Sequence, residues 1–286
     1  MMWKWNVNDR PYRDQVDVAA LAGCECLSIA HRDYQLNLAK GISARDMRSI
    51  AKDRGVVLGM LDAATCWTPI RYPPDKNSFI HERFKLMHDI SPTQAFDMCS
   101  ELGISALLCA PGFEEPTYAI TELTDYFREF CDQAALYNIH VGLEPLPMMG
   151  LKTVQDAFRI VNDANIANGS IVLDTVHFMR SGDGLDILRA IPRGMIKHVQ
   201  VADALPRNPA HSSWEDAAYA RTAPGKGCLP LDDIIACLLQ TQDLESIGLE
   251  FYSSEIEALS SADAGHVLNE TLSRVLNGAT AKVGAT

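Results

Sequence analysis

The stretch from residue 139 to residue 177, IHVGLEPLPMMGLKTVQDAFRIVNDANIANGSIVLDTVH, contains one full repeat of the pattern that decides the fold. A strand-like run at 139–145 is followed by a segment of helical period at 153–162 and by a second apolar run at 170–175. Thr153 precedes the helical segment, where its hydroxyl can accept a hydrogen bond from a free backbone N–H. The stretch therefore predicts a strand, a helix and a second strand.

The same alternation runs through the rest of the chain and predicts eight strands and eight helices in 286 residues. Strand-like runs such as IVLD are continuously apolar, as expected when both faces of a sheet are covered. The sequence thus predicts one (β/α)₈ TIM barrel, a single domain over 1–286, with a doubly wound open sheet as the alternative. The strands are expected at 3–7, 25–31, 56–61, 104–110, 139–145, 170–175, 196–202 and 246–252, and the helices at 13–22, 43–54, 91–102, 121–137, 153–162, 184–190, 231–240 and 262–276.

The charge balance limits the partners of the protein. The chain has 25 basic and 37 acidic residues, a formal net charge of −12 at pH 7. This excess repels phosphate backbones and anionic lipid surfaces. No apolar run approaches the roughly 18 residues of a membrane span, and residues 1–10 lack the apolar stretch of a signal peptide. We therefore expect a cytoplasmic protein with neither a nucleic-acid nor a membrane partner.

Two connections, 62–90 and 203–230, are longer than the others, and both follow predicted strands. Loops after strands form the catalytic face of a barrel, so these two are expected to wall a substrate site. Trp67 and Trp214 lie in them and are candidates for substrate contact, with packing against the barrel as the alternative. Arg221 and Lys226 lie before and within PGKG at 224–227, where they could bind an anion, but the short motif favours a structural turn.

Polar residues stand at the ends of four late strands: Glu144 in VGLEP, Asp174 in IVLDTVH, Gln200 in HVQVAD and Glu250 in IGLEF. Strand ends in a closed barrel point toward one axis at one face, so these side chains are expected to converge. Three carboxylates and an amide oxygen suit Mn²⁺ or Mg²⁺ better than zinc, with Co²⁺ as an alternative. For each residue alone, a helix cap, a salt bridge or a bond to neighbouring backbone is the other interpretation. Three carboxylates around a dication leave a net negative site, which favours neutral or metal-chelating substrates.

Five strings together resemble the xylose isomerase-like TIM barrels, the sugar phosphate isomerase/epimerase group. They occur in the family's order and spacing, and the resemblance covers the chain from about residue 25 onward. They are LEP at 143–145, LDTVH at 173–177, HVQVADA at 198–204, PGKG at 224–227 and GLEF at 248–251.

This resemblance implies a metal site and proton carriers. Glu144, Asp174, Gln200 and Glu250 would bind one divalent ion, and the two glutamates would also carry protons on opposite faces of the substrate. The strand-seven ligand is a histidine in ketose 3-epimerases, whereas Gln200 is similar to 3-dehydroshikimate dehydratases. His198 lies two residues earlier on the same strand and is the alternative ligand.

Two further residues take roles from the same resemblance. His177 follows Asp174 by three residues, matching the family's D-x-x-H, and is the candidate for a substrate-binding or acid–base imidazole. Arg207, in the loop after strand seven, resembles in position a substrate-binding arginine of the family. A solvated loop charge is the alternative for Arg207.

The expected chemistry is proton abstraction next to a carbonyl, which a divalent ion promotes by stabilising negative charge on oxygen. Return of the proton gives isomerisation or epimerisation, and loss of a β-hydroxyl gives dehydration. We expect a divalent-metal-dependent sugar isomerase or epimerase acting on a small sugar, polyol or cyclic keto acid. The alternative is a lyase or dehydratase acting on a 3-dehydroshikimate-like, keto-inositol-like or keto-glycoside compound.

Two other readings are less favoured. An abasic-site endonuclease would need a histidine-rich multi-metal site and a basic DNA-binding face, and the charge of −12 argues against the second. A non-catalytic barrel subunit would retain the fold without metal. The sequence leaves the oligomeric state open, although barrels of this group often form homo-oligomers.

Overall fold

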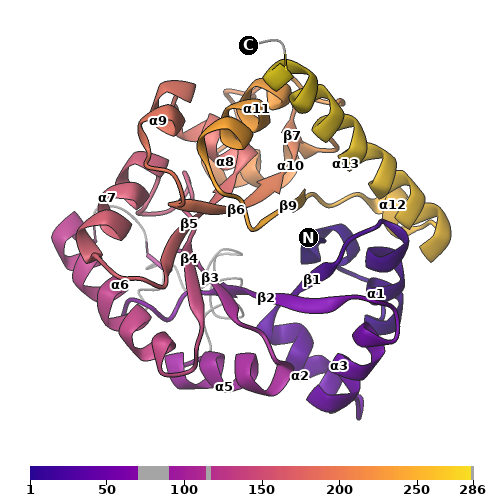
Figure 1. Cartoon of the computed structure of the whole chain (residues 1–286). Helices are drawn as coiled ribbons and strands as arrows, with labels where there is room; N and C mark the ends of the chain where they lie inside the picture. The colour runs from indigo at the N-terminus through magenta and orange to yellow at the C-terminus, as the bar shows by residue number, and fades with distance from the viewer. Residues whose placement is uncertain (70–89, 114–116, 285–286) are drawn as a thin grey trace.

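The chain folds as an α/β TIM barrel, described here by a computed structural model over residues 1–69, 90–113 and 117–284. Seven parallel strands curl around one axis in the order β1-β2-β3-β4-β5-β6-β9, and the helices form a ring outside them (Figure 1). The strands are β1 (Cys26–Ile29), β2 (Val57–Ala64), β3 (Ala106–Cys109), β4 (His140–Leu143), β5 (Gly169–Asp174), β6 (Ile196–Val201) and β9 (Ser246–Leu249), with a separate hairpin of β7 (Asp203–Ala204) and β8 (Arg221–Thr222).

The predicted helices form at the expected places, and several short ones appear in addition. Ser43 and Ser91 cap α3 and α5 through capping boxes, which satisfy backbone N–H groups that would otherwise lack partners. Among the described residues the helices are η1 (Lys4–Val7), α1 (Tyr12–Leu21), α2 (His31–Ala39), α3 (Ala44–Lys52), α5 (Pro92–Leu102), α6 (Ile120–Ala135), α7 (Val154–Ala164), α8 (Thr175–Ser181), α9 (Leu185–Ala190), α10 (Ser213–Tyr219), α11 (Leu231–Thr241), α12 (Ser254–Glu257) and α13 (Ser261–Gly284).

The first two residues, rather than a strand over 3–7, join the two edges of the sheet. Met2 forms a parallel bridge with Leu27 of β1. The Met1 amino group donates to the Ile247 carbonyl of β9 at 2.9 Å. This close approach requires a glycine at 248, because a Cβ there would lie 1.7 Å from the Met1 carbonyl oxygen.

The expected strand at 3–7 is wrong, since Lys4–Val7 form the 3-10 helix η1. The alternation of Trp3, Trp5 and Val7 resembles a strand pattern, but side-chain hydrogen bonds bend the chain. The Asn6 amide donates to the Trp3 carbonyl at 3.1 Å and also to the Leu249 carbonyl. The fully buried Trp3 indole donates to the Val199 carbonyl at 3.2 Å.

Apolar residues fill the space on both sides of the sheet. The main core lies between the strands and the surrounding helices. A second, smaller cluster contains Trp3, Met60, Leu108, Ala110 and Val172. Met60, Leu108 and Val172 alternate along their strands with residues of the main core, so they point to the barrel interior. The interior is therefore packed, and the polar strand ends lie at one end of it.

Of the two long connections that follow strands, the structure describes the second in full and only part of the first. Residues 70–89 of the first connection lie outside the described residues, and its expected role as a substrate wall stays a prediction. The second, 203–230, contains the β7–β8 hairpin and α10. Within the described part of the chain, no helix combines the length and apolarity needed to cross a membrane.

Candidate active site

Four side chains meet at the carboxyl ends of β4, β5, β6 and β9. Asp174 pairs in register with Gln200, and Gln200 pairs with Gly248, two residues before Glu250. The backbone N–H of Glu144 donates to Cys109 and that of Glu250 to Val201, at 2.8 and 2.9 Å, so both glutamates continue the strand ladder. Each of the four side chains belongs to a residue that is at most 6% exposed. The structure thus brings together the residues that the strand-end pattern singled out.

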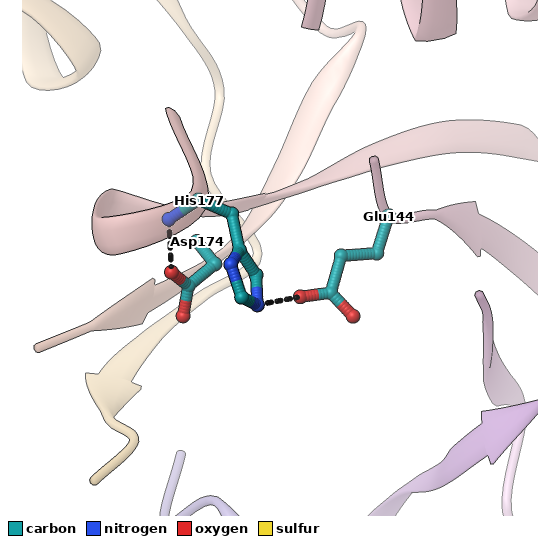
Figure 2. Close-up of side chains that lie close together, drawn as sticks. All are labelled: Glu144, Asp174 and His177. Atoms are coloured by element: carbon teal, nitrogen blue, oxygen red, sulfur yellow. Dashed lines mark hydrogen bonds and ion pairs between the residues drawn. The ribbon is translucent and has the colours of Figure 1, made fainter. Parts of the chain in front are cut away.

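His177 joins this cluster through α8, which begins directly after β5. The Asp174 carboxylate caps the helix by accepting the His177 backbone N–H at 2.8 Å. The imidazole Nε2 then lies 3.8 Å from Glu144 Oε1 (Figure 2). One ligand atom from each of Glu144, Asp174 and His177 falls within 4.8 Å of the others, a grouping that could hold a metal ion. The D-x-x-H spacing works because the helix cap turns the histidine back toward the strand end.

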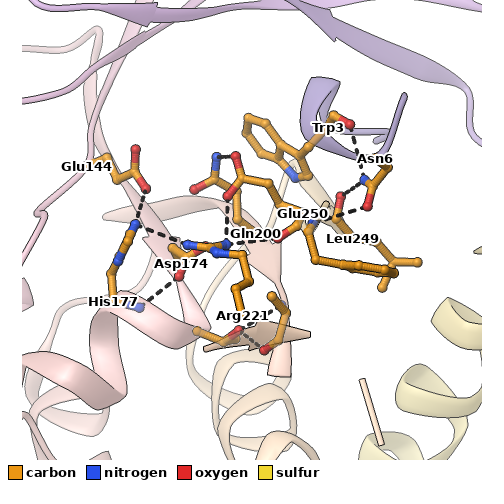
Figure 3. Close-up of polar contacts among 12 residues, drawn as sticks. Trp3, Asn6, Glu144, Asp174, His177, Gln200, Arg221, Leu249 and Glu250 are labelled. Carbon is orange, nitrogen blue, oxygen red and sulfur yellow. Dashed lines mark hydrogen bonds and ion pairs between the residues drawn. The ribbon is translucent and has the colours of Figure 1, made fainter. Parts of the chain in front are cut away.

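Arg221 also reaches the site, where the sequence had suggested only a possible anion contact beside a structural turn. Its Nη1 donates to Asp174 Oδ2 at 2.7 Å, to Glu250 Oε2 at 3.1 Å and to the Glu250 carbonyl at 2.8 Å. Its Nη2 lies 3.2 Å from His177 Nε2 (Figure 3). The signal available in the sequence was the position of Arg221 three residues before PGKG, which was interpreted as an ordinary turn.

Asp203 fixes the loop that carries Arg221. Its carboxylate accepts backbone N–H groups of Ala204, Gly225, Gly227 and Leu229 at 2.8 to 3.1 Å. A Cβ at position 227 would lie 2.3 Å from Asp203 Oδ1, so this turn needs glycine there. Since β7 and β8 pair Ala204 with Arg221, the bonds to Asp203 hold the hairpin in place beside the strand ends. PGKG is thus a structural turn, and its function is to present the arginine.

Gln200 provides the strongest indication that the cluster accommodates a cation. Its Nε2 donates to Glu250 Oε1 at 2.9 Å. Its Oε1 is buried and accepts no hydrogen bond from any residue that the structure describes. A buried acceptor without a partner costs free energy, and a divalent cation among neighbouring carboxylates would satisfy it. The donor set therefore fits a divalent metal.

Burial makes both glutamates of the cluster weak acids. Loss of hydration raises the pKa of Glu144 well above its ordinary value, and the nearby Asp174 charge raises it further. Burial likewise raises the pKa of Glu250, partly offset by Arg221. A raised pKa makes a carboxyl group a weaker acid and its carboxylate a stronger base, which suits general acid–base chemistry.

The pKa values of Asp174 and His177 are lowered, so both side chains are free of the proton that would block a metal. Burial alone would raise the pKa of Asp174, but Arg221 lowers it to about 2. Burial lowers the pKa of His177 to about 4, so the imidazole is neutral at pH 7. Because a guanidinium can only donate, His177 Nε2 accepts from Arg221 and the ring proton is on Nδ1.

Arg221 changes the formal charge of the cluster from the value expected from its three carboxylates alone. Glu144, Asp174 and Glu250 contribute three formal negative charges, and Arg221 contributes one positive charge at contact distance. With a dication the sum is zero rather than −1. Arg221 therefore offsets one of the three carboxylate charges, a contribution that the sequence expectation did not include.

Asp62 extends the acidic surface of the site on the β2 side. Ser28 Oγ donates to Asp62 Oδ2 at 3.1 Å. Burial raises the pKa of Asp62 from 3.8 to about 6, against the lowering effect of the Ser28 hydrogen bond. The Asp62 charge in turn contributes to the raised pKa of Glu144 and of Glu250. Asp62 thus acts electrostatically on both glutamates.

Replacing Asp62 with Asn should remove a pH-dependent loss of stability. A carboxyl group with a raised pKa in the folded state favours folding below pH 3.8, and this contribution is lost as the pH rises through about 6. The shift of about 2 pKa units corresponds to about 3 kcal/mol at pH 7. Asp62→Asn should therefore unfold at higher urea concentration than the natural chain at pH 7 in EDTA, and the two should converge near pH 4.

Asp186→Asn is the matched control, because the Asp186 side chain is 95% exposed. Its unfolding midpoint should follow that of the natural chain at every pH. Parallel stability curves for Asp62→Asn and the natural chain between pH 4 and 8 would contradict the assignment.

Comparison with known families decides where this barrel belongs. The profile of the xylose isomerase-like TIM barrel matches residues 16–270. The chain belongs to the xylose isomerase-like TIM barrel family. The fold expected from the strand and helix alternation is thereby confirmed.

Curated relatives of this xylose isomerase-like barrel include two kinds of enzyme. Inosose isomerase of Bacillus subtilis is 24% identical over 183 residues, covering 61% of this chain and 64% of the relative. A 3-dehydroshikimate dehydratase of Pseudomonas putida is 24% identical over 247 residues, covering 86% of this chain but 36% of the relative. The chain therefore spans less than two thirds of the length of either relative. Both relatives support an enzyme of the isomerase and lyase type within the family.

Solved structures show the same fold. The structure of the IOLI protein with a binding zinc atom has a TM-score of 0.76 at 20% identity and covers 96% of both chains. The probable 3-DHS dehydratase AsbF of Bacillus anthracis has a TM-score of 0.68 at 16% identity, covering 93% of this chain and 97% of that chain.

The two tryptophans that were candidates for substrate contact lie in different surroundings. Trp67 is 3% exposed, and its Nε1 donates to the Ala110 carbonyl at 2.8 Å. Its ring packs edge-on against Phe113 and Phe127. The structure therefore favours the packing role for Trp67. Trp214 is half-buried on α10, and its contact with substrate stays a prediction.

Arg207 and His198, two further residues that the sequence singled out, lie at different distances from the strand-end cluster. Arg207 is exposed and lines a pocket that includes His177. His198 Nδ1 lies 2.9 Å from Ser246 Oγ at the start of β9, whereas Glu250 follows the end of that strand. His198 therefore lies lower in the barrel than the cluster, which argues against its use as the alternative ligand.

Proposed function

We propose that this chain is a divalent-metal-dependent isomerase or epimerase that abstracts a proton next to the carbonyl of a small polyhydroxylated compound. The observation that carries the proposal is the arrangement of Glu144 and Glu250 around Asp174 and Gln200. The strand order β4-β5-β6-β9 places the two glutamates at the two ends of the cluster. Two weak acids separated by ligand groups can remove a proton on one side of a substrate and return it on the other.

The metal ligands in this proposal are Glu144, Asp174, Gln200 and Glu250. Carboxylate and amide oxygens favour Mn²⁺ or Mg²⁺, with Co²⁺ as an alternative. His177 Nε2, close to Glu144, adds a nitrogen that would also suit zinc. A bound divalent ion would stabilise the negative charge that develops on the carbonyl oxygen as the proton leaves.

Arg221 and His177 would orient the substrate. The guanidinium is a donor to oxygens and is fixed by Asp174 and Glu250, so its remaining N–H groups are available to a hydroxyl or carbonyl oxygen. When substrate takes the Arg221 contact, His177 Nε2 is released as a neutral acceptor for a hydroxyl proton. Both residues then bind the reacting end of the molecule while the glutamates carry protons.

A lyase that dehydrates a 3-dehydroshikimate-like compound is the second candidate. Gln200 favours it, because glutamine at this strand resembles the dehydratases rather than the ketose 3-epimerases. The same proton abstraction leads to elimination when a hydroxyl stands β to the carbonyl. A keto-inositol-like substrate would fit either outcome.

Incubation in D₂O with inosose and with 3-dehydroshikimate separates these reactions. An isomerase or epimerase should give an isomeric product carrying solvent deuterium, detected by mass spectrometry and NMR. A lyase should give a conjugated product that absorbs in the ultraviolet. EDTA should abolish either reaction, and Mn²⁺, Mg²⁺, Co²⁺ and Zn²⁺ added separately should identify the ion that restores it.

Metal analysis of the purified protein supplies the control. We expect about one divalent ion per chain and its loss in Glu250→Gln. Full turnover by protein freed of divalent ions would contradict the proposal.

A further inference from the structure

Arg180 of α8 holds two points of the connection at 205–220, which lies within the β7–β8 hairpin. Its Nη2 donates to the Leu205 carbonyl, directly after β7, at 2.7 Å. Its Nε lies 2.6 Å from Asp216 Oδ2 on α10, and the two side chains are only 15% and 5% exposed. Helix α8 lies beside β7 (Figure 1). One guanidinium therefore fastens α8 to the end of β7 and to α10.

The hairpin passes the contact at Leu205 on to Arg221. The Leu205 backbone N–H donates to the Ala220 carbonyl at 2.8 Å. Ala204 and Arg221, the next pair along the hairpin, are partners in the β7–β8 ladder. The Arg221 guanidinium then lies 3.2 Å from His177 Nε2. The hairpin thus connects the carbonyl that α8 holds to the guanidinium in the cluster.

The same helix also carries His177. His177 and Arg180 are three residues apart on α8, so they lie on one face of the helix, about one turn apart. The first turn is fixed because Asp174 accepts the His177 backbone N–H at 2.8 Å. Helix α8 therefore fixes the imidazole at its first turn and the hairpin at its last. The contact between His177 and Arg221 closes this circuit of interactions.

A guanidinium is suited to holding two partners at once. Its N–H donors form a planar fork, so Nε and Nη2 can face a carboxylate and a carbonyl together, whereas lysine has a single nitrogen on a flexible stem. The ion pair of Arg180 with Asp216 is also largely shielded from water, which strengthens it relative to an exposed pair.

We propose that Arg180 is a positioning residue that sets the place of Arg221 relative to His177. Arg180 itself touches no substrate. It acts through the hairpin on the two groups that orient the substrate, so the part of the inference that concerns substrate rests on the proposed function. The link between Arg180 and Arg221 is a property of the protein alone.

A double-mutant cycle of urea unfolding in EDTA tests this link without substrate or metal. Arg180→Lys keeps a positive charge beside Asp216 but cannot hold the Leu205 carbonyl at the same time. It should lower the urea midpoint of the natural chain and should lower that of Arg221→Met clearly less, because an absent guanidinium cannot be misplaced. Equal shifts in the two backgrounds would mean that Arg180 only packs α8 against α10, and would overturn the proposal.

Calorimetric binding of myo-inositol to the Mn²⁺-loaded chain tests the effect on a ligand. This compound has the hydroxyls of a polyol and no ketone, so it cannot turn over. Arg180→Lys should weaken its binding by about tenfold, as expected for a displaced binding group, and should have no further effect in Arg221→Met. An equal weakening in both backgrounds would contradict action through Arg221.

Arg189→Gln is the matched control, because Arg189 forms an exposed pair with Asp186 on α9, the next helix along the chain. Its effects on unfolding and on binding should be small and independent of Arg221→Met. Coupling between Arg180 and Arg221 in unfolding, in a chain that binds neither myo-inositol nor 3-dehydroshikimate, would keep the positioning link and reject the proposed function.

Discussion

Replacing Glu250 with Gln should lower the rate of proton exchange from the substrate carbon by about 10²- to 10⁴-fold, the usual contribution of a positioned acid or base. The loss combines two effects, because the amide cannot take a proton and offers the metal a neutral ligand. The rate of deuterium incorporation into inosose or 3-dehydroshikimate measures this proton exchange directly. The change is isosteric, so packing around the strand end is preserved.

A measurement of the free energy of unfolding shows whether the slower exchange comes from the lost acid–base group or from an unfolded protein. Burial raises the pKa of Glu250, so its charged form is costly in the folded chain at pH 7, and the neutral amide should not lower the free energy of unfolding. Glu245→Gln at the opposite end of β9 is the control, because Glu245 pairs with Lys197 at 2.6 Å and its side chain is 50% exposed. A Glu250→Gln protein that exchanges deuterium at the natural rate would reject the proton-carrying role.

Arg221→Met should make the stability of the barrel depend on metal. Removing the guanidinium leaves Asp174 and Glu250 buried without their cation, which typically costs about 3–5 kcal/mol. Added Mn²⁺ would supply opposite charge at the same carboxylates and should recover much of this loss. Urea unfolding in EDTA and in Mn²⁺ should therefore differ far more for Arg221→Met than for the natural chain.

Arg193→Met serves as control for the loss of an arginine. The pair it forms with Asp243 is exposed, and such pairs contribute about 0–1 kcal/mol. It should lose little stability and gain no additional metal dependence. If Arg221→Met in EDTA were as stable as the natural chain, the guanidinium would not be what balances the cluster.

The parts of the site that sequence predicted are those fixed by strand geometry. Glu144, Asp174, Gln200 and Glu250 each stand at a strand end, and closure of a parallel barrel forces such ends together whatever the loops do. The resemblance to the family's D-x-x-H predicted His177, and the structure gives the physical reason for this spacing, because Asp174 caps the helix that carries the histidine. Their catalytic and metal-binding roles stay predictions, as does the extent of the single domain.

The parts that sequence could not predict depend on how loops and termini fold back. Arg221 reaches the cluster only because the β7–β8 hairpin pairs and Asp203 fastens its turn, neither of which has a periodic signal. Arg207 and Arg221 lie in the same long loop after β6, and the sequence does not show which of the two reaches the cluster. The alternation at 3–7 likewise could not reveal the competing hydrogen bonds of Asn6.

The hairpin between β6 and β9 has a consequence for the order in which the barrel assembles. Gln200, Asp203, Arg221 and Glu250 all lie in one stretch from 200 to 250, so the guanidinium meets the last carboxylate through a short loop closure. We expect the last strand to dock on a cluster that already contains its countercharge, so that like charges do not oppose the closing of the sheet.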